Sequence, residues 1–357
     1  MIDYLVVGSG LAGIAFCRIL QENNRSFLLY DDGVQQSSTV AAGIYNPVVL
    51  KRFKAVWNAA AQLDVALPFY ETFQRDFSVQ LHHQLPIYRK FSSVEEQNLW
   101  FEASDKSALQ PFLSTTLVEN KNPGIIAPFY LGKVLHTGRI DVALLQSTFR
   151  EYLQQQKRLV KERLHYELLE VSPTAIKYKQ HSARHLVCCE GFGLHQNSLF
   201  KYLPLQGAKG ELITIKAPEL KLHTIIKSSL FIIPVGHHTY KVGATYAWHD
   251  KTQRTTPEAR QELITRLRTL LNCPFEVIGQ QAGIRPTVID RRPLVGTHPT
   301  LTNVHILNGL GSRGVLMAPF AARQLYQHIE TATPLATAID IKRFEDKYIE
   351  PKKQMIV

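Results

Sequence analysis

The chain has 357 residues, of which 45% are hydrophobic and 20% charged, and its formal net charge is +11. This length exceeds one ordinary hydrophobic core and predicts two domains, and the composition is typical of a soluble globular protein. The four cysteines form no C-x-x-C pair, and neither a basic leader nor an apolar run of membrane-spanning length is present, so we expect a cytoplasmic protein. Lys and Arg are spread along the chain, which favours a solvated basic surface over a site for a polyanion such as RNA.

The first residues predict a β-α-β unit. Residues 2–8 are an apolar run typical of a buried strand, residues 11–24 carry apolar side chains at helical spacing, and residues 26–32 predict a second buried strand. A long helix is expected through residues 55–75, and a mixed region follows it to about residue 138.

The rest of the chain alternates between helices and groups of short strands. Residues 141–156 predict an amphipathic helix with Asp141 as its N-cap, and residues 165–171 and 175–179 predict a hairpin. Residues 184–191 predict a buried strand that ends in glycine. The remaining predicted elements are several short strands within residues 211–245, a helix over 257–271, strands near 276–283 and over 304–308, and a helix over about 313–330.

This order predicts an α/β fold with a discontinuous domain. Parallel units at both ends of the chain enclose β-rich middle stretches, so we expect a Rossmann-like, nucleotide-binding domain with an inserted α+β substrate domain that contains a mainly antiparallel sheet. The predicted ranges are 1–75, 139–205 and 296–357 for the nucleotide-binding domain, and 76–138 and 206–295 for the substrate domain.

The first glycine cluster has the form of a dinucleotide-binding loop. Gly8, Gly10 and Gly13 follow a predicted strand and open a predicted helix, where they would permit a tight turn, close approach of the pyrophosphate, and close packing of helix and strand. The helix N-terminus would offer its free N–H groups to the pyrophosphate. Asp31 ends the next strand near the expected spacing of about 20 residues for the carboxylate that binds a ribose hydroxyl. These features do not distinguish NAD from FAD as the bound dinucleotide.

A second glycine cluster, "NGLGSRG" at residues 308–314, favours FAD, because an extended FAD must be held at both ends. Gly309, Gly311 and Gly314 would let the backbone approach the flat flavin ring. The helix that begins near Arg313 would direct its positive end at the ring's pyrimidine edge and favour the reduced, negatively charged form. A glycine-rich turn that caps a surface helix is the alternative interpretation.

Further stretches extend this pattern over nearly the whole chain, in the order "STVAAGIYNP" (38–47), "LVCCEGFG" (186–193), "LQGAKGELITI" (205–215) and "GIRPTVIDRRPLVG" (283–296). Together with the two glycine clusters they resemble the D-amino-acid oxidase superfamily of FAD-dependent oxidoreductases. Within it, the resemblance is closest to the glycine oxidases and to the FAD oxidase domain of the bifunctional enzymes that modify the wobble uridine of tRNA. The segments "GLGSRG" and "GIYNP" are more similar to the FAD oxidase domain of the tRNA-modifying enzymes.

The resemblance implies roles for particular residues. Arg285 would grip the substrate carboxylate, a task that suits the rigid, permanently charged guanidinium; a surface ion pair with Asp290 is the alternative. Lys241 lies where some relatives carry a lysine that helps oxygen react with reduced flavin, although a strand lysine commonly faces solvent. Phe231 occupies roughly the place of a tyrosine that lies near the substrate in glycine oxidase, which puts free glycine as the substrate in doubt.

The resemblance also implies that Gly43 and Ile44 pass beside the flavin and that Gly191 lies near the adenosine. Residues 308–314 contain neither Cys nor His, where some relatives attach flavin covalently, so we expect non-covalent FAD. No metal site is predicted, because the pairs at 82–83 and 237–238 are adjacent histidines that face opposite sides of a strand. The predicted cofactor-binding residues are Gly8, Gly10, Leu11, Ala12, Gly13, Asp31, Asp32, Ala42, Gly43, Ile44, Gly191, Gly309, Gly311, Ser312, Arg313, Gly314 and Val315.

These features predict an enzyme that oxidises the C–N bond of a carboxylate-bearing amine by hydride transfer to flavin, with molecular oxygen as the expected electron acceptor. Positioning and electrostatics suffice for this chemistry, so no side-chain base is required. One alternative is an oxidase of the carboxymethylaminomethyl group of tRNA wobble uridine, which the +11 charge favours, although this chain has no methyltransferase domain. Two further possibilities are an NAD-dependent dehydrogenase and a flavin-binding protein without catalysis.

Overall fold

The computed structural model describes residues 1–34 and 37–349. Their contacts divide the chain into two compact units. The first unit, as described, comprises residues 1–34, 146–207 and 285–349, and the second comprises residues 37–145 and 208–284. Among the described residues, no helix combines the length and the apolar character that crossing a membrane requires.

This division departs from the predicted domain ranges near several boundaries. Residues 37–75 and 139–145 group with the second unit, and residues 285–295 with the first. The reason for the first difference is a small sheet in the order β3-β10-β6, which joins Ile44–Tyr45 to Gly138–Ile140 and His82–His83. The assignment of one unit to the cofactor and the other to the substrate stays a prediction.

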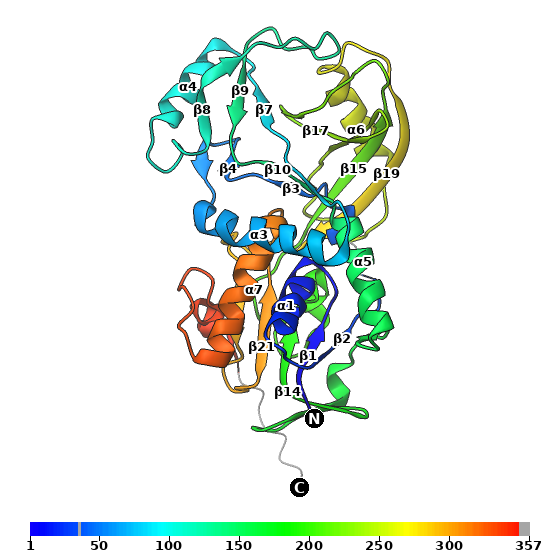
Figure 1. The fold of residues 1–357 in the computed structure, drawn as a ribbon, viewed down its shortest axis with the longest axis vertical. Helices are drawn as coiled ribbons and strands as arrows, with labels where there is room; N and C mark the ends of the chain where they lie inside the picture. The colour runs from blue at the N-terminus through cyan, green and yellow to red at the C-terminus, as the bar shows by residue number, and fades with distance from the viewer. Residues whose placement is uncertain (35–36, 350–357) are drawn as a thin grey trace. The chain divides into compact units, whose positions relative to one another are not determined.

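A mostly parallel sheet forms the centre of the first unit (Figure 1). Its parallel strands follow the order β11-β2-β1-β14-β21, and the hairpin of β12 and β13 and the strand β20 are antiparallel additions. The carboxyl ends of β1, β2, β14 and β21 therefore share one edge of the sheet. The strands are β1 (Ile2–Val7), β2 (Phe27–Tyr30), β11 (Leu159–Val160), β12 (Leu169–Val171), β13 (Ile176–Tyr178), β14 (His181–Cys188), β20 (Leu294–Thr297) and β21 (Val304–Asn308).

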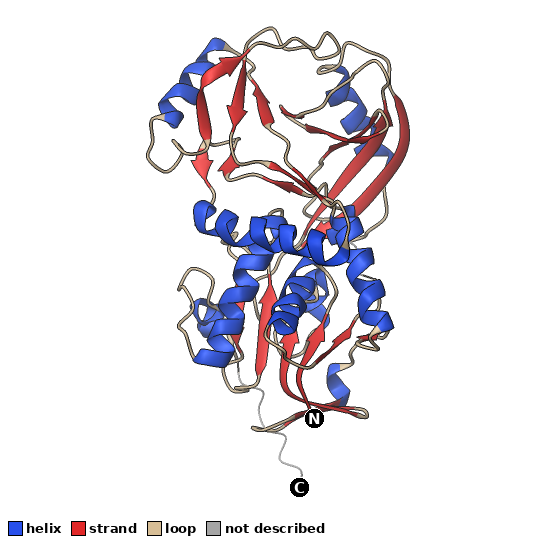
Figure 2. Cartoon of the chain, in the orientation of Figure 1, coloured by secondary structure: helices blue, strands red, loops and turns tan. Residues whose placement is uncertain are grey.

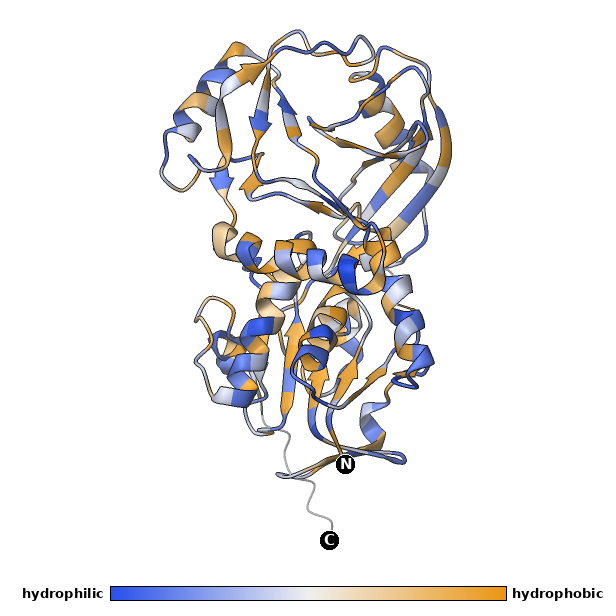
Figure 3. Cartoon of the chain, viewed as in Figure 1, coloured by the Kyte–Doolittle hydropathy of each residue, from blue (hydrophilic) through white to orange (hydrophobic). Residues whose placement is uncertain are grey.

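Helices cover this sheet, and its central strands are apolar on both faces. The helices α1 (Leu11–Glu22) and α7 (Gly314–Thr331) pack against each other, and both contact β21. Consecutive residues of β1, such as Leu5 and Val6, are fully buried. Figure 3 shows that the central strands are mainly apolar toward their carboxyl ends, as expected of parallel strands covered on both sides, whereas the first half of β14 is mostly polar. Short 3-10 helices complete the unit at Tyr166–Leu168, Gly191–Gln196 and Ile341–Lys347.

The second unit contains an eight-stranded sheet in the order β19-β15-β18-β17-β16-β7-β9-β8 (Figure 2). The pairings of β18 with β15 and β17 and of β9 with β7 and β8 are antiparallel, whereas β16 and β7 are parallel. The predicted α/β fold with a mainly antiparallel second sheet is thereby confirmed. The strands of the large sheet are β7 (Ile87–Lys90), β8 (Leu113–Val118), β9 (Leu131–Val134), β15 (Ala208–Lys216), β16 (Ile225–Lys227), β17 (Phe231–Gly236), β18 (Thr239–Gly243) and β19 (Glu276–Arg285).

The other elements of this unit are short strands and helices. The strands are β3 (Ile44–Tyr45), β4 (Val48–Val49), β5 (Lys54–Ala55), β6 (His82–His83) and β10 (Gly138–Ile140). The helices are α2 (Ser37–Val40), α3 (Ala59–Phe77), α4 (Val94–Ser104) and α6 (Pro257–Arg268), and α5 (Val142–Gln155) crosses the boundary between the units.

The predicted elements are present, but several differ in extent: the first strand of the predicted hairpin begins only at Leu169, after a 3-10 helix, and β14 ends at Cys188 rather than at a glycine. The helix expected from residue 55 begins at Ala59, because β5 pairs with β4 and Asn58 adopts a left-handed conformation with φ 48°. The strand β16 and the elements β7, α4, β8 and β9 are not separately predicted from the sequence. The N-cap prediction is confirmed, since the Asp141 carboxylate accepts a hydrogen bond of 3.1 Å from the Leu144 N–H.

A buried charged group joins three elements of the second unit. Lys209, at the start of β15, is 1% exposed and lies 2.5 Å from Asp250 and 3.3 Å from Glu211. Glu211 also accepts hydrogen bonds from Thr256, the N-cap of α6, and from Gln280 of β19. The hydrogen bond from Lys209 lowers the pKa of Asp250 to about 2. Lys209 therefore balances two carboxylates at a point where α6, β15 and β19 meet.

Replacing Lys209 by Met should destabilise the second unit. The variant keeps the length of the side chain but leaves the Glu211 carboxylate buried without Lys209, and breaking a buried ion pair from one side costs about 3–5 kcal/mol. Denaturant unfolding should show a lower midpoint. Lys216→Met, at an exposed position of the same strand, is the control and should change stability by less than about 0.5 kcal/mol. An unchanged midpoint for Lys209→Met would show that the pair adds no net stability.

Candidate functional site

The first glycine cluster forms a tight turn between β1 and α1. Gly8 has a φ of 98°, its N–H donates to the Tyr30 carbonyl at 2.8 Å, and a Cβ placed on it would lie 2.6 Å from the Cys189 carbonyl oxygen. A Cβ on Gly13 would lie 1.8 Å from the Gly8 carbonyl oxygen. Both positions therefore require glycine, for the two reasons that the dinucleotide motif gives: a backbone with positive φ and close packing of helix on strand.

Asp31 directly follows β2 and reaches this turn. One carboxylate oxygen accepts the Ser9 N–H at 2.5 Å, and the other accepts the Gly33 N–H at 2.7 Å and pairs with Arg150 at 2.7 Å. Arg150 also donates to the Ser9 hydroxyl, and Gln146 donates to the Ser9 carbonyl at 3.0 Å. A carboxylate has about four acceptor positions. After these three donors, one position of Asp31 remains, which is what the predicted contact with a ribose hydroxyl needs.

The geometry of the turn fits the extended dinucleotide that the sequence predicts. Gly10 is the N-cap of α1, and no described side chain caps this helix or places an acid in its first turn. The helix N-terminus thus keeps its positive character for a pyrophosphate. Leu11 and Ala12 are buried at the start of α1, while Asp32 is exposed and accepts the Val34 N–H at 2.9 Å, as a turn residue does.

One asparagine joins two separate predicted segments. Asn308, which is 2% exposed, donates through its side chain to the Gly191 carbonyl at 3.0 Å and accepts the Gly309 N–H at 2.7 Å. Gly191 lies at the start of a 3-10 helix, three residues beyond Cys188, the last residue of β14, and so does not close the strand as the sequence predicts. Its φ is 59°, and a Cβ there would meet no described atom within 4 Å. The residue therefore borders open space at the predicted adenosine end.

The second glycine cluster also lies against the first. A Cβ on Gly314, the first residue of α7, would lie 2.9 Å from the Leu11 side chain. Gly309 and Gly311 have φ values of 74° and 55°, which glycine tolerates and other residues adopt rarely. The helix begins where predicted, with Arg313 as its N-cap, half-buried like Gly314. The neighbouring predicted residues Ser312 and Val315 are exposed and buried, respectively.

Arg285 ends β19 immediately before a contact with this second cluster. The Pro286 carbonyl accepts the Gly311 N–H at 2.9 Å, and Thr287 forms an antiparallel bridge with Leu310. The arginine itself is half-buried. The alternative partner, Asp290, pairs with Arg343 at 2.8 Å. The backbone at Arg285 is therefore anchored next to the segment predicted to meet the flavin.

Four predicted residues lie in the second unit. Gly43 has a φ of 75° and its Cβ would lie 1.9 Å from the Ile140 carbonyl oxygen, while its neighbours Ala42 and Ile44 are half-buried. Lys241 of β18 is also half-buried, and burial lowers its pKa against the opposing influence of Asp141. This lysine thus differs from a fully solvated strand lysine.

Phe231 and the histidine pairs have other partners. The ring of Phe231 is half-buried, with the Lys227 ammonium 4.5 Å from its centroid, so it is not simply a core residue. His82 lies 2.7 Å from the Tyr45 hydroxyl. The described residues contain no group of three or more His, Cys, Asp or Glu that could hold a metal ion.

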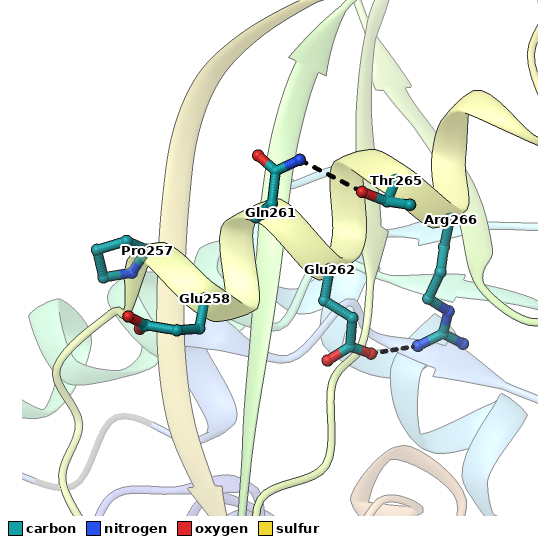
Figure 4. Close-up of a pocket in the computed structure, with 6 residues that line it drawn as sticks. All are labelled: Pro257, Glu258, Gln261, Glu262, Thr265 and Arg266. Atoms are coloured by element: carbon teal, nitrogen blue, oxygen red, sulfur yellow. Dashed lines mark hydrogen bonds and ion pairs between the residues drawn. The ribbon is translucent and has the colours of Figure 1, made fainter.

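A surface hollow along α6 is separate from these residues. Figure 4 shows that it is lined by one face of the helix, where Glu262 pairs with Arg266 at 2.7 Å and Gln261 donates to Thr265 at 3.3 Å. These side chains satisfy one another, and none belongs to the predicted site. The hollow is therefore not a candidate cofactor or substrate site.

Within the first unit, the structure brings the two glycine clusters, Asp31 and Gly191 to the same edge of the parallel sheet. The residues that fix this edge were not predicted from the sequence: Arg150 and Gln146 on α5, Ser9 in the loop before α1, and Asn308 at the end of β21. Only Asn308 had a local signal, since it precedes the glycine cluster at the end of a strand. Arg150 and Gln146 had no such signal, because a charged or polar residue on an amphipathic helix is ordinarily solvated.

Gly13→Ala should loosen both the fold and the retention of FAD. The new Cβ would have to move away from the Gly8 carbonyl oxygen, which displaces α1 from β1 at a cost of about 2–3 kcal/mol. Thermal unfolding and the flavin content of the purified protein measure the effect. Gly279→Ala is the matched control, because its Cβ would meet nothing closer than 3.6 Å. Full flavin content with unchanged melting in Gly13→Ala would contradict the packing argument.

Comparison with known proteins agrees with this geometry. The family model described as "DAO: FAD dependent oxidoreductase" matches residues 3–327. The crystal structure of glycine oxidase from Geobacillus kaustophilus has a TM-score of 0.77 at 17% identity, covering 96% of this chain and 97% of that one, and so shares the fold.

Among sequence relatives, glycine oxidase of Bacillus licheniformis is 21% identical over 348 residues, which cover 89% of this chain and 90% of that protein. The tRNA 5-methylaminomethyl-2-thiouridine biosynthesis bifunctional protein MnmC of Marinobacter nauticus is 27% identical over 140 residues, covering 36% of this chain and 22% of that protein. This chain covers less than a third of the length of the MnmC relatives that it matches. Because the family model spans most of the sequence, the chain belongs to the DAO family of FAD-dependent oxidoreductases, and FAD is its cofactor.

Proposed function

We propose that this oxidoreductase oxidises the C–N bond of an amine that carries a carboxylate. The observation that carries the proposal is the position of Arg285, because the carbonyl of the next residue, Pro286, accepts a hydrogen bond from the Gly311 N–H in the second glycine cluster. Arg285 is half-buried, and its guanidinium is suited to a carboxylate, because its planar fork pairs with both carboxylate oxygens.

FAD supplies an acceptor for the hydride of the substrate's α C–H bond. The protein's part is to position the amine: Arg285 would hold the carboxylate, so that the α-carbon is fixed relative to the loop at 309–314. The N-terminus of α7, with its positive dipole end, would stabilise negative charge near that loop. The imine product then adds water and separates into a carbonyl compound and an amine. No side chain is needed as a base if the amine binds uncharged.

Molecular oxygen is the proposed electron acceptor, which would be reduced to hydrogen peroxide as the flavin is reoxidised. Lys241 is the residue proposed to assist this step, as a cation held partly out of water near Asp141. Non-covalent binding of FAD is proposed because the loop at 308–314 offers neither Cys nor His.

Arg285→Ala should retain FAD but lose reduction by the amine substrate. Removing one side of a desolvated charge pair costs about 3–5 kcal/mol, so the efficiency of flavin reduction should fall by about 100- to 1,000-fold or more. Anaerobic stopped-flow absorbance measures the reduction, and FAD released on denaturation measures retention. Arg291→Ala, an exposed arginine in the following turn, should behave like the wild type. Near-normal flavin reduction in the Arg285→Ala variant would show that Arg285 is a surface residue that does not bind the substrate.

A second candidate substrate is tRNA that carries a carboxymethylaminomethyl group on its wobble uridine. This group also contains a secondary amine and a carboxylate, so Arg285 would serve it in the same way. The net charge of +11 supports this candidate, as does the similarity to relatives named for tRNA biosynthesis. Phe231, where a glycine oxidase would contribute a hydroxyl, favours it over free glycine.

If tRNA is the substrate, its binding should depend steeply on salt. Each phosphate contact releases counterions, so contacts by several Lys and Arg residues should weaken binding by about 100-fold between about 50 and 200 mM salt. Wobble-modified tRNA should then reduce the flavin faster than glycine or sarcosine does. Absence of tRNA binding at low ionic strength, together with efficient turnover of a free amino acid, would leave the small-amine reaction as the function.

A further inference from the structure

Arg139 is a buried arginine beside the predicted flavin segment of the second unit. It lies in the middle of β10, where it pairs with Ile44 of β3 on one side and His83 of β6 on the other. A Cβ on Gly43 would lie 3.5 Å from the Arg139 side chain. The residue is only 6% exposed. The stem of its side chain thus packs directly on residues 43–44, which the family resemblance associates with the cofactor.

The hydrogen-bonding capacity of this guanidinium is largely unfilled. Its one ion pair in the described structure, from Nη1 to Asp141, is long at 3.3 Å. Its Nε is buried and has no hydrogen-bond partner among the described residues. A buried donor that is left unpaired costs about 1–3 kcal/mol, and more when the group is charged. This unfavourable free energy would be offset if a bound group supplied a hydrogen-bond acceptor to Arg139.

Arg89 of the same unit shows how a structural arginine is satisfied in this protein. Its side chain is 16% exposed, its Nε donates to Glu96 at 2.8 Å, and its Nη1 donates to the Ser228 carbonyl at 2.9 Å. Its remaining nitrogen also pairs with Glu96. Arg89 therefore has a nearby acceptor for each of its nitrogens, whereas the more deeply buried Arg139 has one weak acceptor.

The charges around Arg139 leave an excess of positive charge. Burial raises the pKa of Asp141, but the hydrogen bond from the Leu144 N–H and the two cations Arg139 and Lys241 hold it below its ordinary value. Burial lowers the pKa of Lys241, with Asp141 opposing and Arg139 adding to the effect. Burial and Arg139 also lower the pKa of His83, against the opposing influence of Asp141. Two cations thus share one carboxylate, which is itself engaged as the N-cap of α5.

We propose that Arg139 and Lys241 form an anion site within the second unit that takes a carboxylate of an amine substrate with two such groups. An incoming carboxylate would supply the acceptors that Asp141 does not, and it would balance the charge. The guanidinium fork would orient the group and the ammonium would add a point charge. This inference rests on the proposed amine oxidation and specifies its substrate as an amine with two acidic groups.

The test compares two amines that differ in one carboxylate: iminodiacetate, with two, and sarcosine, with one. Anaerobic flavin reduction of the FAD-loaded protein gives the substrate dissociation constant and the limiting rate separately. Wild-type protein should bind iminodiacetate at least about 10-fold more tightly than sarcosine. Arg139→Met should raise the dissociation constant of iminodiacetate by about 10- to 100-fold and change that of sarcosine by less than about threefold. The limiting rates of flavin reduction should change little. Lys241→Met, at a less buried position, should weaken iminodiacetate binding to a smaller extent in this anaerobic measurement, which leaves out the oxygen step proposed for Lys241.

Calorimetric titration with malonate, an unreactive dicarboxylate, gives an independent measure of the site, and Arg89→Met is the control. Malonate should bind to the wild type and to Arg89→Met, and binding should be lost in Arg139→Met. If neither amine reduces the flavin but malonate binding depends on Arg139, the anion site stands and the amine-oxidation proposal fails. If the amines react but show no preference, and malonate binds wild type and Arg139→Met equally, the anion site is overturned.

Discussion

The close approach of α1 to the end of β1 is the constraint on which the first unit depends. The Gly13 position lies so near the Gly8 carbonyl that any side chain would separate helix from strand. This contact fixes the N-terminus of α1 at the carboxyl edge of the parallel sheet, where its N–H groups and positive dipole end are available. The same contact sets the position of α7, because Leu11 at the start of α1 packs on Gly314 at the start of α7. One packing requirement thereby aligns two helix N-termini.

Side chains from distant parts of the sequence hold the turn in this position. Ser9 is bonded through its N–H, hydroxyl and carbonyl to Asp31, Arg150 and Gln146. At the same sheet edge, Asn308 ties the loop after β14 to the loop after β21. These polar groups of the loops are thus bonded within the protein, while the N–H groups at the start of α1 have no side-chain cap among the described residues and Gly191 borders open space. This combination gives a rigid backbone cradle, as preorganised binding of a cofactor requires.

Three cations of the second unit, which are buried or half-buried, differ in how they are paired. Lys209 and Arg89 have carboxylates and carbonyls at hydrogen-bonding distance, and they act as structural links between helices and strands. Arg139 lacks this arrangement although it is more deeply buried than Arg89. Because removing a charge from water is costly unless the charge is paired, the contrast distinguishes a group that stabilises the fold from one suited to an incoming anion.

The sequence by itself determined the α/β class, the order of the main elements and the glycine positions, because these depend on local periodicity and on backbone conformations that glycine adopts most readily. It also determined that Asp31 follows the second strand and that Asp141 caps a helix, since both are local relations. The grouping of residues 37–75 with the second unit was decided by the pairing of β3 with β10, which are far apart in the sequence. The same holds for Arg150 at Asp31, Asn308 at Gly191 and Arg139 at Gly43. Such contacts depend on how strands pair and helices pack across long separations, and no local pattern around an arginine or asparagine specifies its partner.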